Sequence, residues 1–335
     1  MIEPFTRSDI TSCYRMEGDG LTFGVAPERM REIVREGSGL LWVDIAAGQD
    51  RAVGERLLRE IFGFHPLTVD DCYNTLIDPP KVDDYGDYLF IIVHEVHYDA
   101  PDEVLWSSEL DLYVGRNYVV TLHRYPASSV DEVRRRGEQR SLVLDKGAGF
   151  LAHALIDVAV DNFQPVVERL DEQVEAVEER VLVQPERDVL QEVLRLRRNA
   201  QRLRRSILPQ RDVVNRFARG EYERLVGQAS LMYFRDIYDH TVRVDEMIEG
   251  VRDQADSALN TYLSSVNNRV NEVMKTLAIV AAIFLPLTLV ASIYGTNFEN
   301  TLPEYGHNAG FVGMIVVMAV IAAGLLWWFR WRRWI

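Results

Sequence analysis

The sequence predicts a membrane protein of the α+β class, with an N-terminal α/β domain, long helices after it, and two transmembrane helices at the C-terminal end. Short runs rich in β-branched and aromatic residues, which are typical of strands, occur only in the first third of the 335 residues. After Gly149 these strand signals stop and apolar residues recur at helical spacing. Two runs of 19 residues without a charged side chain follow, 276–294 and 311–329. Each is long enough to cross about 30 Å of hydrocarbon as a helix.

Composition argues against several classes of partner and site. The net charge of −14 and the pI near 5.0 disfavour nucleic acid as a partner, because phosphates need a basic surface. Cys13 and Cys72 are the only cysteines and lack C-x-x-C spacing, so we expect neither a disulfide framework nor a zinc knuckle. The first residues show no basic start followed by an apolar run, so we expect no signal peptide.

Four strands and two helices are predicted in the first third of the chain. The strands are residues 39–46, 88–98, 108–115 and 118–124. After the first strand, residues 47–65 carry apolar residues at helical spacing that ends near Gly63, and Pro66 opens a second short helix. His94 and His97 form the sequence "HEVH", but strand alternation directs them to opposite faces, so we expect no zinc site there.

The following part of the chain predicts a pair of helices and then a very long one. Apolar residues of the first helix are spaced by four, three and four, with acids between them, as in a coiled coil: Leu170, Val174, Val177 and Val181. After Pro185 a second helix carries many arginines, which we expect to pair with the acids of the first helix. From about Tyr222 the helical pattern runs to Tyr294 with one proline, which is roughly 110 Å at about 1.5 Å per residue.

Basic residues flank the two apolar runs on one side only. They are Arg269, Lys275, Arg330, Arg332 and Arg333, and none lies in the connection. The positive-inside rule therefore places both termini in the cytoplasm and the connection outside. The predicted parts are a cytoplasmic α/β domain (1–145), a helical hairpin (146–220), a stalk helix (221–294) that becomes the first span at about 275, an extracytoplasmic loop (295–309), the second span (310–329) and a basic tail (330–335). A buried hairpin of a soluble protein is the alternative to the two spans.

One face of the first span has polar ends and small or flexible residues between them. Alternating steps of three and four residues give Asn271, Met274, Ala278, Ala281, Leu285, Thr288 and Ser292. Small residues in a membrane helix also mark helix packing, and that interpretation stays open. A pore would need several copies of the chain, because two spans cannot enclose a channel.

The outer end of the first span suits a hydrated cation. Because the helix ends there, its last carbonyl groups place partial negative charge outside. Gly295 allows the backbone to leave the helix, and Asn297 supplies a neutral amide oxygen. Glu299 and Glu304 add negative charge, which raises the local concentration of cations. Neutral oxygens can bind the water shell of Mg²⁺, which gives up its water reluctantly.

Several segments, in the right order, resemble the CorA family of magnesium and cobalt transporters over most of the chain. The sequence "YGTNF" (294–298) is similar to the family's YGMNF signature, with Thr296 in the place of the methionine. Residues 271–288 resemble the family's pore helix, and "LPEY" resembles its MPEL loop. The segments "HPLTVDD" and "YFRDIYDH" also resemble their family counterparts.

The resemblance implies a homopentamer with a cytoplasmic funnel of long helices and a central pore. Gly295, Thr296 and Asn297 would form the selectivity filter. The resemblance implies polar rings at Asn271 and Thr288 and a hydrophobic constriction at Met274, Leu277 and Leu285, and the helical face described above adds Ala281 and Ser292 as pore-lining residues.

Four acids match positions at which the family holds regulatory Mg²⁺ between neighbouring subunits. They are Asp71 with Asp236 and, at a second site, Asp70 with Asp157. A divalent ion that joins facing carboxylates would stabilise a closed state, and its loss would favour opening. Two other interpretations stay open. Asp70 and Asp71 could be first-turn acids near a helix N-terminus, and Asp236 could form an ion pair with Arg235 or a neighbour.

The expected function is channel-like import of divalent cations, above all Mg²⁺, with Co²⁺ and Ni²⁺ as further candidates. The membrane potential would drive the flux and intracellular Mg²⁺ would gate it. The first alternative is proton-coupled Zn²⁺ transport as in the ZntB group, which Thr296 leaves open, and the second is a membrane-anchored scaffold or sensor. No nucleophile–base pair or phosphate loop is recognised, so we expect no enzyme. The missing transit peptide favours the plasma membrane of a prokaryote.

Overall fold

The computed structural model describes residues 9–16, 21–48, 51–99, 104–139, 142–183, 186–295 and 308–334. The chain divides into two compact units, one of Met1–Arg180 with Glu186–Leu259 and one of Val181–Pro185 with Asn260–Ile335. The finer domain boundaries expected from the sequence stay predictions.

The described residues of the first unit form a seven-stranded mixed sheet in the order β2-β1-β3-β7-β6-β5-β4. Its strands are β1 (Asp9–Arg15), β2 (Leu21–Phe23), β3 (Leu40–Ala46), β4 (Lys81–Asp84), β5 (Tyr88–Asp99), β6 (Val104–Gly115) and β7 (Tyr118–His123). Strands β3 and β7 are parallel, and the other neighbours are antiparallel. The four predicted strands are confirmed as β3, β5, β6 and β7. Strands β1, β2 and β4 were not predicted, because β1 and β4 are rich in polar residues and β2 is only three residues long.

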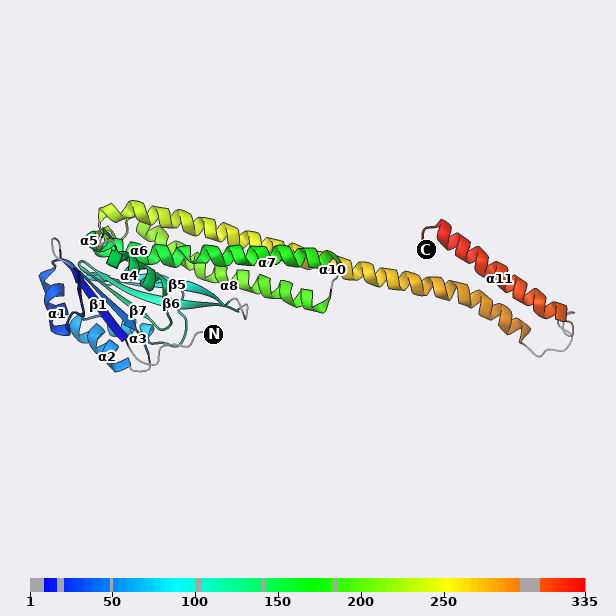
Figure 1. The fold of residues 1–335 in the computed structure, drawn as a ribbon, viewed down its shortest axis with the longest axis horizontal. Helices are drawn as coiled ribbons and strands as arrows, with labels where there is room; N and C mark the ends of the chain where they lie inside the picture. The colour runs from blue at the N-terminus through cyan, green and yellow to red at the C-terminus, as the bar shows by residue number, and fades with distance from the viewer. Residues whose placement is uncertain are drawn as a thin grey trace. The chain divides into compact units, whose positions relative to one another are not determined.

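Helices cover both faces of this sheet, and each face has its own hydrophobic core (Figure 1). On one face lie α1 (Pro27–Glu36), α2 (Arg51–Arg56), the π-helical turn η1 (Leu57–Ile61) and α3 (Pro66–Cys72); on the other lie α4 (Ser128–Gln139), α5 (Leu142–Asp145) and α6 (Ala148–Asp161). The alternation along β3 shows the division: Leu41, Val43 and Ile45 enter the first core, and Leu40 and Trp42 enter the second. The cytoplasmic part expected from the sequence is therefore a layered α/β fold.

The end of η1 and the start of α3, both near the first core, lie where the sequence predicts a helix end and a helix start. The turn η1 ends at Ile61, just before Gly63, whose φ of 71° is readily adopted only by glycine. His65 then caps α3, and its Nδ1 accepts a hydrogen bond from the backbone N–H of Leu67 at 3.2 Å. Pro66 occupies the first turn, where its missing N–H costs nothing.

The remaining elements are helical: α7 (Phe163–Val183), α8 (Arg187–Ala218), α9 (Glu223–Val226), the 3₁₀ turn η2 (Gln228–Ser230), α10 (Leu231–Tyr294) and α11 (Asn308–Trp331). The expected partners of the α8 arginines were wrong. Among the described residues, the ion pairs of these arginines with another long helix go to acids of α10: Arg197 pairs with Asp256, Arg204 with Glu249 and Asp245, and Arg211 with Asp245. Between α7 and α8 the charges are reversed, because Arg180 of α7 binds Asp188 and Glu192 of α8. Acids spaced by four and seven residues along α10 present their carboxylates to α8 as one row.

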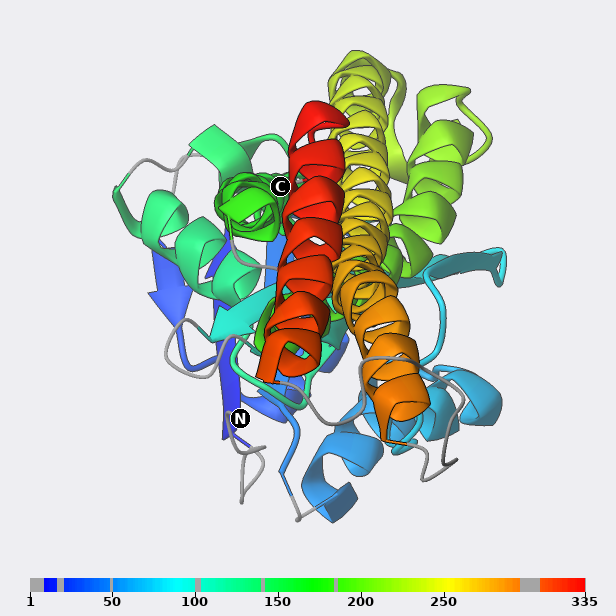
Figure 2. The same ribbon diagram turned by 90° about the vertical axis from the view of Figure 1, so that its right-hand side faces the viewer.

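The second unit contains α11 and the last part of α10, which begins in the first unit. Two helical segments, Gln228–Tyr294 and Gly310–Trp331, are long and apolar enough to cross a membrane, each with a most apolar window of mean hydropathy 2.4. Only 6% of either window is buried, whereas the core helix of a soluble protein would be mostly buried. The last part of α10 and α11, orange and red in Figures 1 and 2, run in opposite directions, as a membrane hairpin requires.

Candidate functional site

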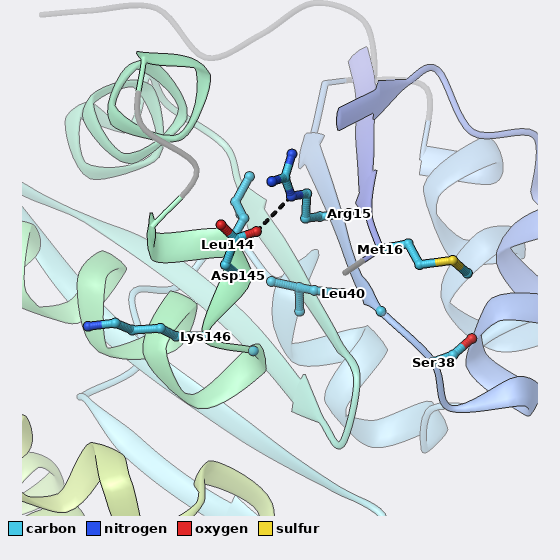
Figure 3. A pocket seen from close by; sticks show the side chains of 9 residues that line it. Arg15, Met16, Ser38, Leu40, Leu144, Asp145 and Lys146 are labelled. Carbon is cyan, nitrogen blue, oxygen red and sulfur yellow. Dashed lines mark hydrogen bonds and ion pairs between the residues drawn. The ribbon is translucent and has the colours of Figure 1, made fainter. Parts of the chain in front are cut away.

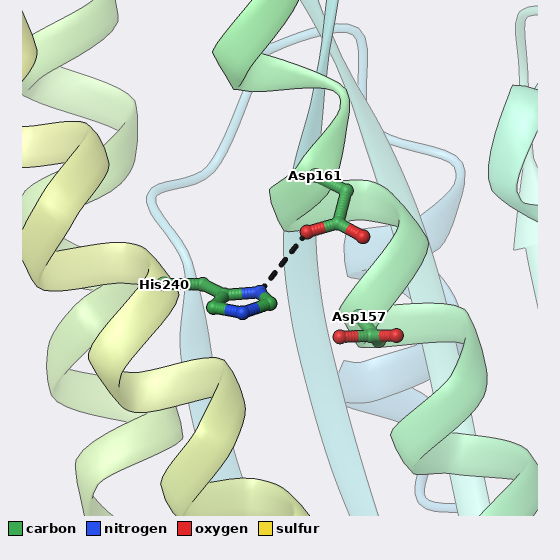
Figure 4. Close-up of side chains that lie close together, drawn as sticks. All are labelled: Asp157, Asp161 and His240. Carbon is green, nitrogen blue, oxygen red and sulfur yellow. Dashed lines mark hydrogen bonds and ion pairs between the residues drawn. The ribbon is translucent and has the colours of Figure 1, made fainter.

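A cluster of two acids and one histidine lies where α6 faces α10 (Figure 4). Asp157 and Asp161 are four residues apart and share one face of α6. His240 reaches them from α10, and its Nδ1 lies 3.2 Å from Asp161 Oδ1. One ligand atom from each of the three side chains lies within 4.8 Å of the others. Carboxylate oxygens and an imidazole nitrogen are donors that divalent metal ions accept.

The cluster carries surplus negative charge. The pKa of Asp157 is raised to about 6, mainly by burial. The neighbouring charges of Asp161 and Asp236 contribute to this rise, whereas His240 and Arg136 oppose it. Three carboxylates thus lie near two basic side chains, His240 and Arg136. A divalent cation would remove this repulsion, so the residues present fit such an ion.

Asp70 and Asp71 lie in the last turn of α3, not in the first, so the first-turn interpretation was wrong. The helix ends at Cys72 after seven residues, so both acids lie at the negative end of the helix dipole, which is unfavourable for a carboxylate. Cationic side chains beside each acid offset this effect. Asp71 Oδ2 binds Lys81 Nζ at 2.7 Å, and Asp70 Oδ1 lies 3.0 Å from guanidinium groups of Arg51 and Arg59.

The Asp71–Lys81 contact is half-buried and affects Lys81. Burial lowers the pKa of the Lys81 ammonium, but the hydrogen bond that Lys81 donates to Asp71 and the charge of Asp71 outweigh burial and hold the pKa above its ordinary value. Lys81 is thus a charged partner of Asp71 in the chain without metal. A cation that binds Asp71 must compete with this ammonium.

The structure groups the four predicted regulatory acids into two places. Asp157 and Asp236 interact electrostatically, whereas Asp70 and Asp71 lie on α3. Among the described residues, no hydrogen bond or ion pair joins Asp71 to Asp236 or Asp70 to Asp157. Both pairings are expected between subunits, so they stay predictions for a single chain. Within the same described part, Asp236 forms no ion pair with Arg235.

Sequence reasoning missed Asp161 and His240 as possible metal ligands. The available signal was spacing: Asp157 and Asp161 are four residues apart, as are Asp236 and His240. Such spacing places each pair on one face of its helix. It did not reveal that α6 and α10 bring these faces together.

The predicted pore-lining residues are exposed in the single chain: Asn271, Met274, Leu277, Ala281, Leu285, Thr288 and Ser292. Thr288 Oγ1 donates a hydrogen bond to the carbonyl oxygen of Phe284 at 2.8 Å, so its lone pairs, rather than its proton, remain for a passing ion's water. Gly295 follows α10 and its N–H still donates to Ala291 at 2.9 Å. The other predicted filter and loop residues, Thr296, Asn297, Glu299 and Glu304, lie outside the described residues.

A separate cavity of about 690 Å³ lies between the ends of β1 and β3 and the start of α6 (Figure 3). Arg15 Nε and Asp145 Oδ1 form an ion pair of 2.7 Å across it. Lys146 points away from this pair, and its Nζ lies 4.9 Å from the ring centre of Phe150. The charges that line this cavity are therefore committed to neighbours, and it offers no ligand set comparable to the cluster on α6 and α10.

Comparisons with known proteins agree with this architecture. Residues 37–333 match the family model described as CorA-like Mg²⁺ transporter protein. The chain is 36% identical over 302 residues to the cobalt/magnesium transport protein CorA of Thermotoga maritima, covering 90% of this chain and 85% of that protein. It is 25% identical over 263 residues to the zinc transport protein ZntB of Cronobacter sakazakii, covering 76% and 77%.

The fold is also that of a solved full-length transporter. The complete structure of the CorA magnesium transporter from Methanocaldococcus jannaschii aligns with a TM-score of 0.84 at 22% identity and covers 99% of both chains. An α/β soluble part, a long helix and two candidate membrane helices are thus shared over the whole length. Together with the match of the family model to most of the sequence, this shows that the chain is a membrane protein that belongs to the family of CorA-like Mg²⁺ transporter proteins.

Proposed function

We propose that this chain is the subunit of a homopentameric channel that imports divalent cations, above all Mg²⁺, with Co²⁺ and Ni²⁺ as further candidates. The observation that carries the proposal is the exposed face of α10 from Asn271 to Ser292, polar at both ends and apolar between. A single chain leaves this face without cover, and five copies around an axis would convert it into a pore wall. The relative from Thermotoga maritima is a cobalt/magnesium transport protein, which supports the choice of ion.

The driving force in this proposal is the membrane potential. A doubly charged ion gains about 4.6 kcal/mol per 100 mV, twice the value for one charge, when it moves to the negative side. No chemical step is needed for uptake. The polar rings at Asn271 and Thr288 would bind the water shell, and the apolar rings at Met274, Leu277 and Leu285 would block flux when dewetted.

Regulation by intracellular Mg²⁺ is the second part of the proposal. Mg²⁺ held by Asp71 with Asp236, and by Asp70 with Asp157, would join neighbouring subunits in a closed state. The contacts of the single chain support a switch, because lysine and arginine already neutralise Asp71 and Asp70. When Mg²⁺ is lost, these cations would again pair with the carboxylates of their own subunit. The subunits could then separate without leaving an unpaired carboxylate at the interface.

Zinc transport is the competing proposal. The ZntB relative carries that name, and Thr296 changes the residue between the glycine and the asparagine of the signature. The wider coverage and higher identity of the cobalt/magnesium relative favour Mg²⁺. A scaffold without transport would not need polar residues at both ends of a long apolar helix face.

Flux into liposomes tests the proposal. The full chain is reconstituted with a Mg²⁺-sensitive dye inside and an inside-negative potential. We expect influx that Asn297→Ala abolishes, whereas Asn300→Ala, a matched amide three residues further along the loop, leaves it within about twofold. Absence of Mg²⁺ influx from folded, oligomeric protein would overturn the Mg²⁺ proposal. Zn²⁺ influx that requires a proton gradient would then support the competing one.

A further inference from the structure

Two carboxylates on β6 face a small cavity that is separate from the cluster on α6 and α10. Glu109 and Asp111 alternate along the strand and so point to the same side of the sheet, the side of Tyr113 and the first core. The cavity has a volume of about 100 Å³ and is closed by the end of α3 and the turn of residues 74–77. It holds the volume of roughly three water molecules, or of an ion with part of its water shell.

Asp111 is the unusual member of this pair. Its side chain is 2% exposed and lines the cavity. Among the described residues, no donor reaches its buried Oδ1 atom. A buried carboxylate oxygen without a hydrogen-bond partner is costly, because burial removes the water that would otherwise bind it. The missing partner is therefore an observation that points to a ligand in the cavity.

Glu109 is held in place by the turn that closes the cavity. Its Oε1 accepts a hydrogen bond from the backbone N–H of Asp78, and the paired residue on β5, His94, donates from Nε2 to the carbonyl oxygen of Asp78 at 2.7 Å. The backbone of Asp78 is thus bound on both sides by one cross-strand pair. This leaves the second oxygen of Glu109 for another partner.

Both acidic and basic side chains line the cavity: Glu109 and Asp111 on one strand, and His123 and Arg124 beside them. The pKa of Glu109 is raised to about 8, mainly by burial and then by the charge of Asp111. The hydrogen bond from the backbone of Asp78 and the charge of Arg124 oppose this rise, whereas the charge of Asp78 adds to it. The pKa of Asp111 is raised to about 7, mainly by burial. The charges of Asp71 and Asp78 add to this rise, whereas the Cys72 thiol and the charge of Lys81 oppose it. The Arg124 guanidinium donates to the carbonyl oxygen of Asn74 at 2.7 Å and so stabilises the turn rather than the carboxylates.

We propose that this cavity is a binding site for a hard divalent cation such as Mg²⁺ or Mn²⁺, with Asp111 Oδ1 and Glu109 as its carboxylate ligands. Oxygen ligands of the turn and water complete the coordination. Such an ion supplies the partner that Asp111 lacks and joins β6 to the turn after α3. The site lies within the soluble unit and does not depend on transport.

Mn²⁺ binding to the full chain in detergent tests the site. The number of bound ions per chain is counted by equilibrium dialysis for the wild type, Asp111→Asn, Glu109→Gln and the exposed control Asp131→Asn. We expect the wild type and the control to bind one ion more per chain than either cavity variant. Equal counts in all four proteins would overturn the proposal and leave the cavity to water or protons.

Two further measurements separate a binding role from a structural one. Without metal, both cavity variants should melt at the wild-type temperature or above it, because each removes a buried acid; lower melting in both would assign them a structural role and overturn the proposal. With Mn²⁺, calorimetry in two buffers of different ionisation enthalpy should show proton release in the wild type that is smaller in Asp111→Asn. Equal proton release in the two proteins would also contradict the site.

Discussion

The substitution Asp157→Asn should stabilise the chain when no divalent cation is present. The pKa of Asp157 is about 6 in the folded chain, against an ordinary value of 3.8. The folded state therefore binds more protons than the unfolded state between these values, so stability falls as the pH rises through this window. At pH 7 the difference of roughly two pKa units corresponds to about 3 kcal/mol. Because the carboxylate is only half-buried, solvent screening reduces our expectation to about 1–2 kcal/mol.

The assay is thermal unfolding of the full chain in detergent with a chelator. For a unit of this size, each kcal/mol shifts the melting temperature by about 2–4 °C, so we expect Asp157→Asn to melt about 2–8 °C higher at pH 7. The gain should vanish below about pH 4, where the wild-type carboxyl is protonated in both states. Asp253→Asn, an exposed acid on α10, is the control and should change little. A lower melting temperature for Asp157→Asn at pH 7, or a gain that persists at pH 4, would refute the electrostatic reasoning.

Three further predictions concern other contacts. Burial lowers the pKa of His123, but Asp44 and the backbone carbonyl of Tyr125 outweigh it and raise the pKa. His123→Gln should therefore lose stability most below about pH 6.5 and progressively less as the pH rises through the raised pKa. Melting curves from pH 5 to 9 check this. Lys81→Met removes the ammonium that competes for Asp71, so under the proposed regulation the Mg²⁺ concentration that half-protects the chain from proteolysis should fall about 1.5- to 5-fold; a rise would contradict competition. Gly149→Ala places a Cβ 2.0 Å from a backbone oxygen and should lower the free energy of unfolding by about 1–3 kcal/mol. The Cβ of Gly250→Ala meets nothing within 4 Å, so this control should raise it by about 0.5–1 kcal/mol. Equal melting temperatures of the two variants would show that the backbone moves to accept the Cβ at position 149.

The central strands and the long helices could be predicted because their patterns are set locally. Strands β3 and β5–β7 are apolar over most of their length, since both faces of the sheet are covered by helices. Strands β1 and β4 lie toward the edges and take their stability from pairing with a neighbour, so their polar residues gave no signal. Family membership confirms that the chain is not an enzyme, and it is consistent with the two predicted spans.

Contacts between distant elements could not be predicted in this way. His240 was visible in the sequence beside Asp236, but its approach to Asp161 depends on how α6 packs on α10. The partners of the α8 arginines could not be predicted for the same reason. A row of charges on a helix indicates that oppositely charged partners exist, but it does not indicate which helix supplies them. The prediction that Asp71 lies in the first turn of its helix was wrong for a more local reason. Helix α3 ends after two turns, so an acid a few residues from its start already lies in its last turn.

The arrangement of internal cations bears on how a regulatory ion would act. A carboxylate that is bare in the metal-free chain would bind Mg²⁺ tightly and release it slowly, whereas Asp71 has a lysine partner at 2.7 Å. Binding of Mg²⁺ to Asp71 breaks the Asp71–Lys81 ion pair, and the loss of this pair lowers the affinity of Asp71 for Mg²⁺. Asp157 has the opposite bias, because its neighbours include two further acids and it gains the most from an added cation. The second proposed site joins Asp157 to Asp70, which two arginines already neutralise, so its two carboxylates act on the affinity for Mg²⁺ in opposite directions.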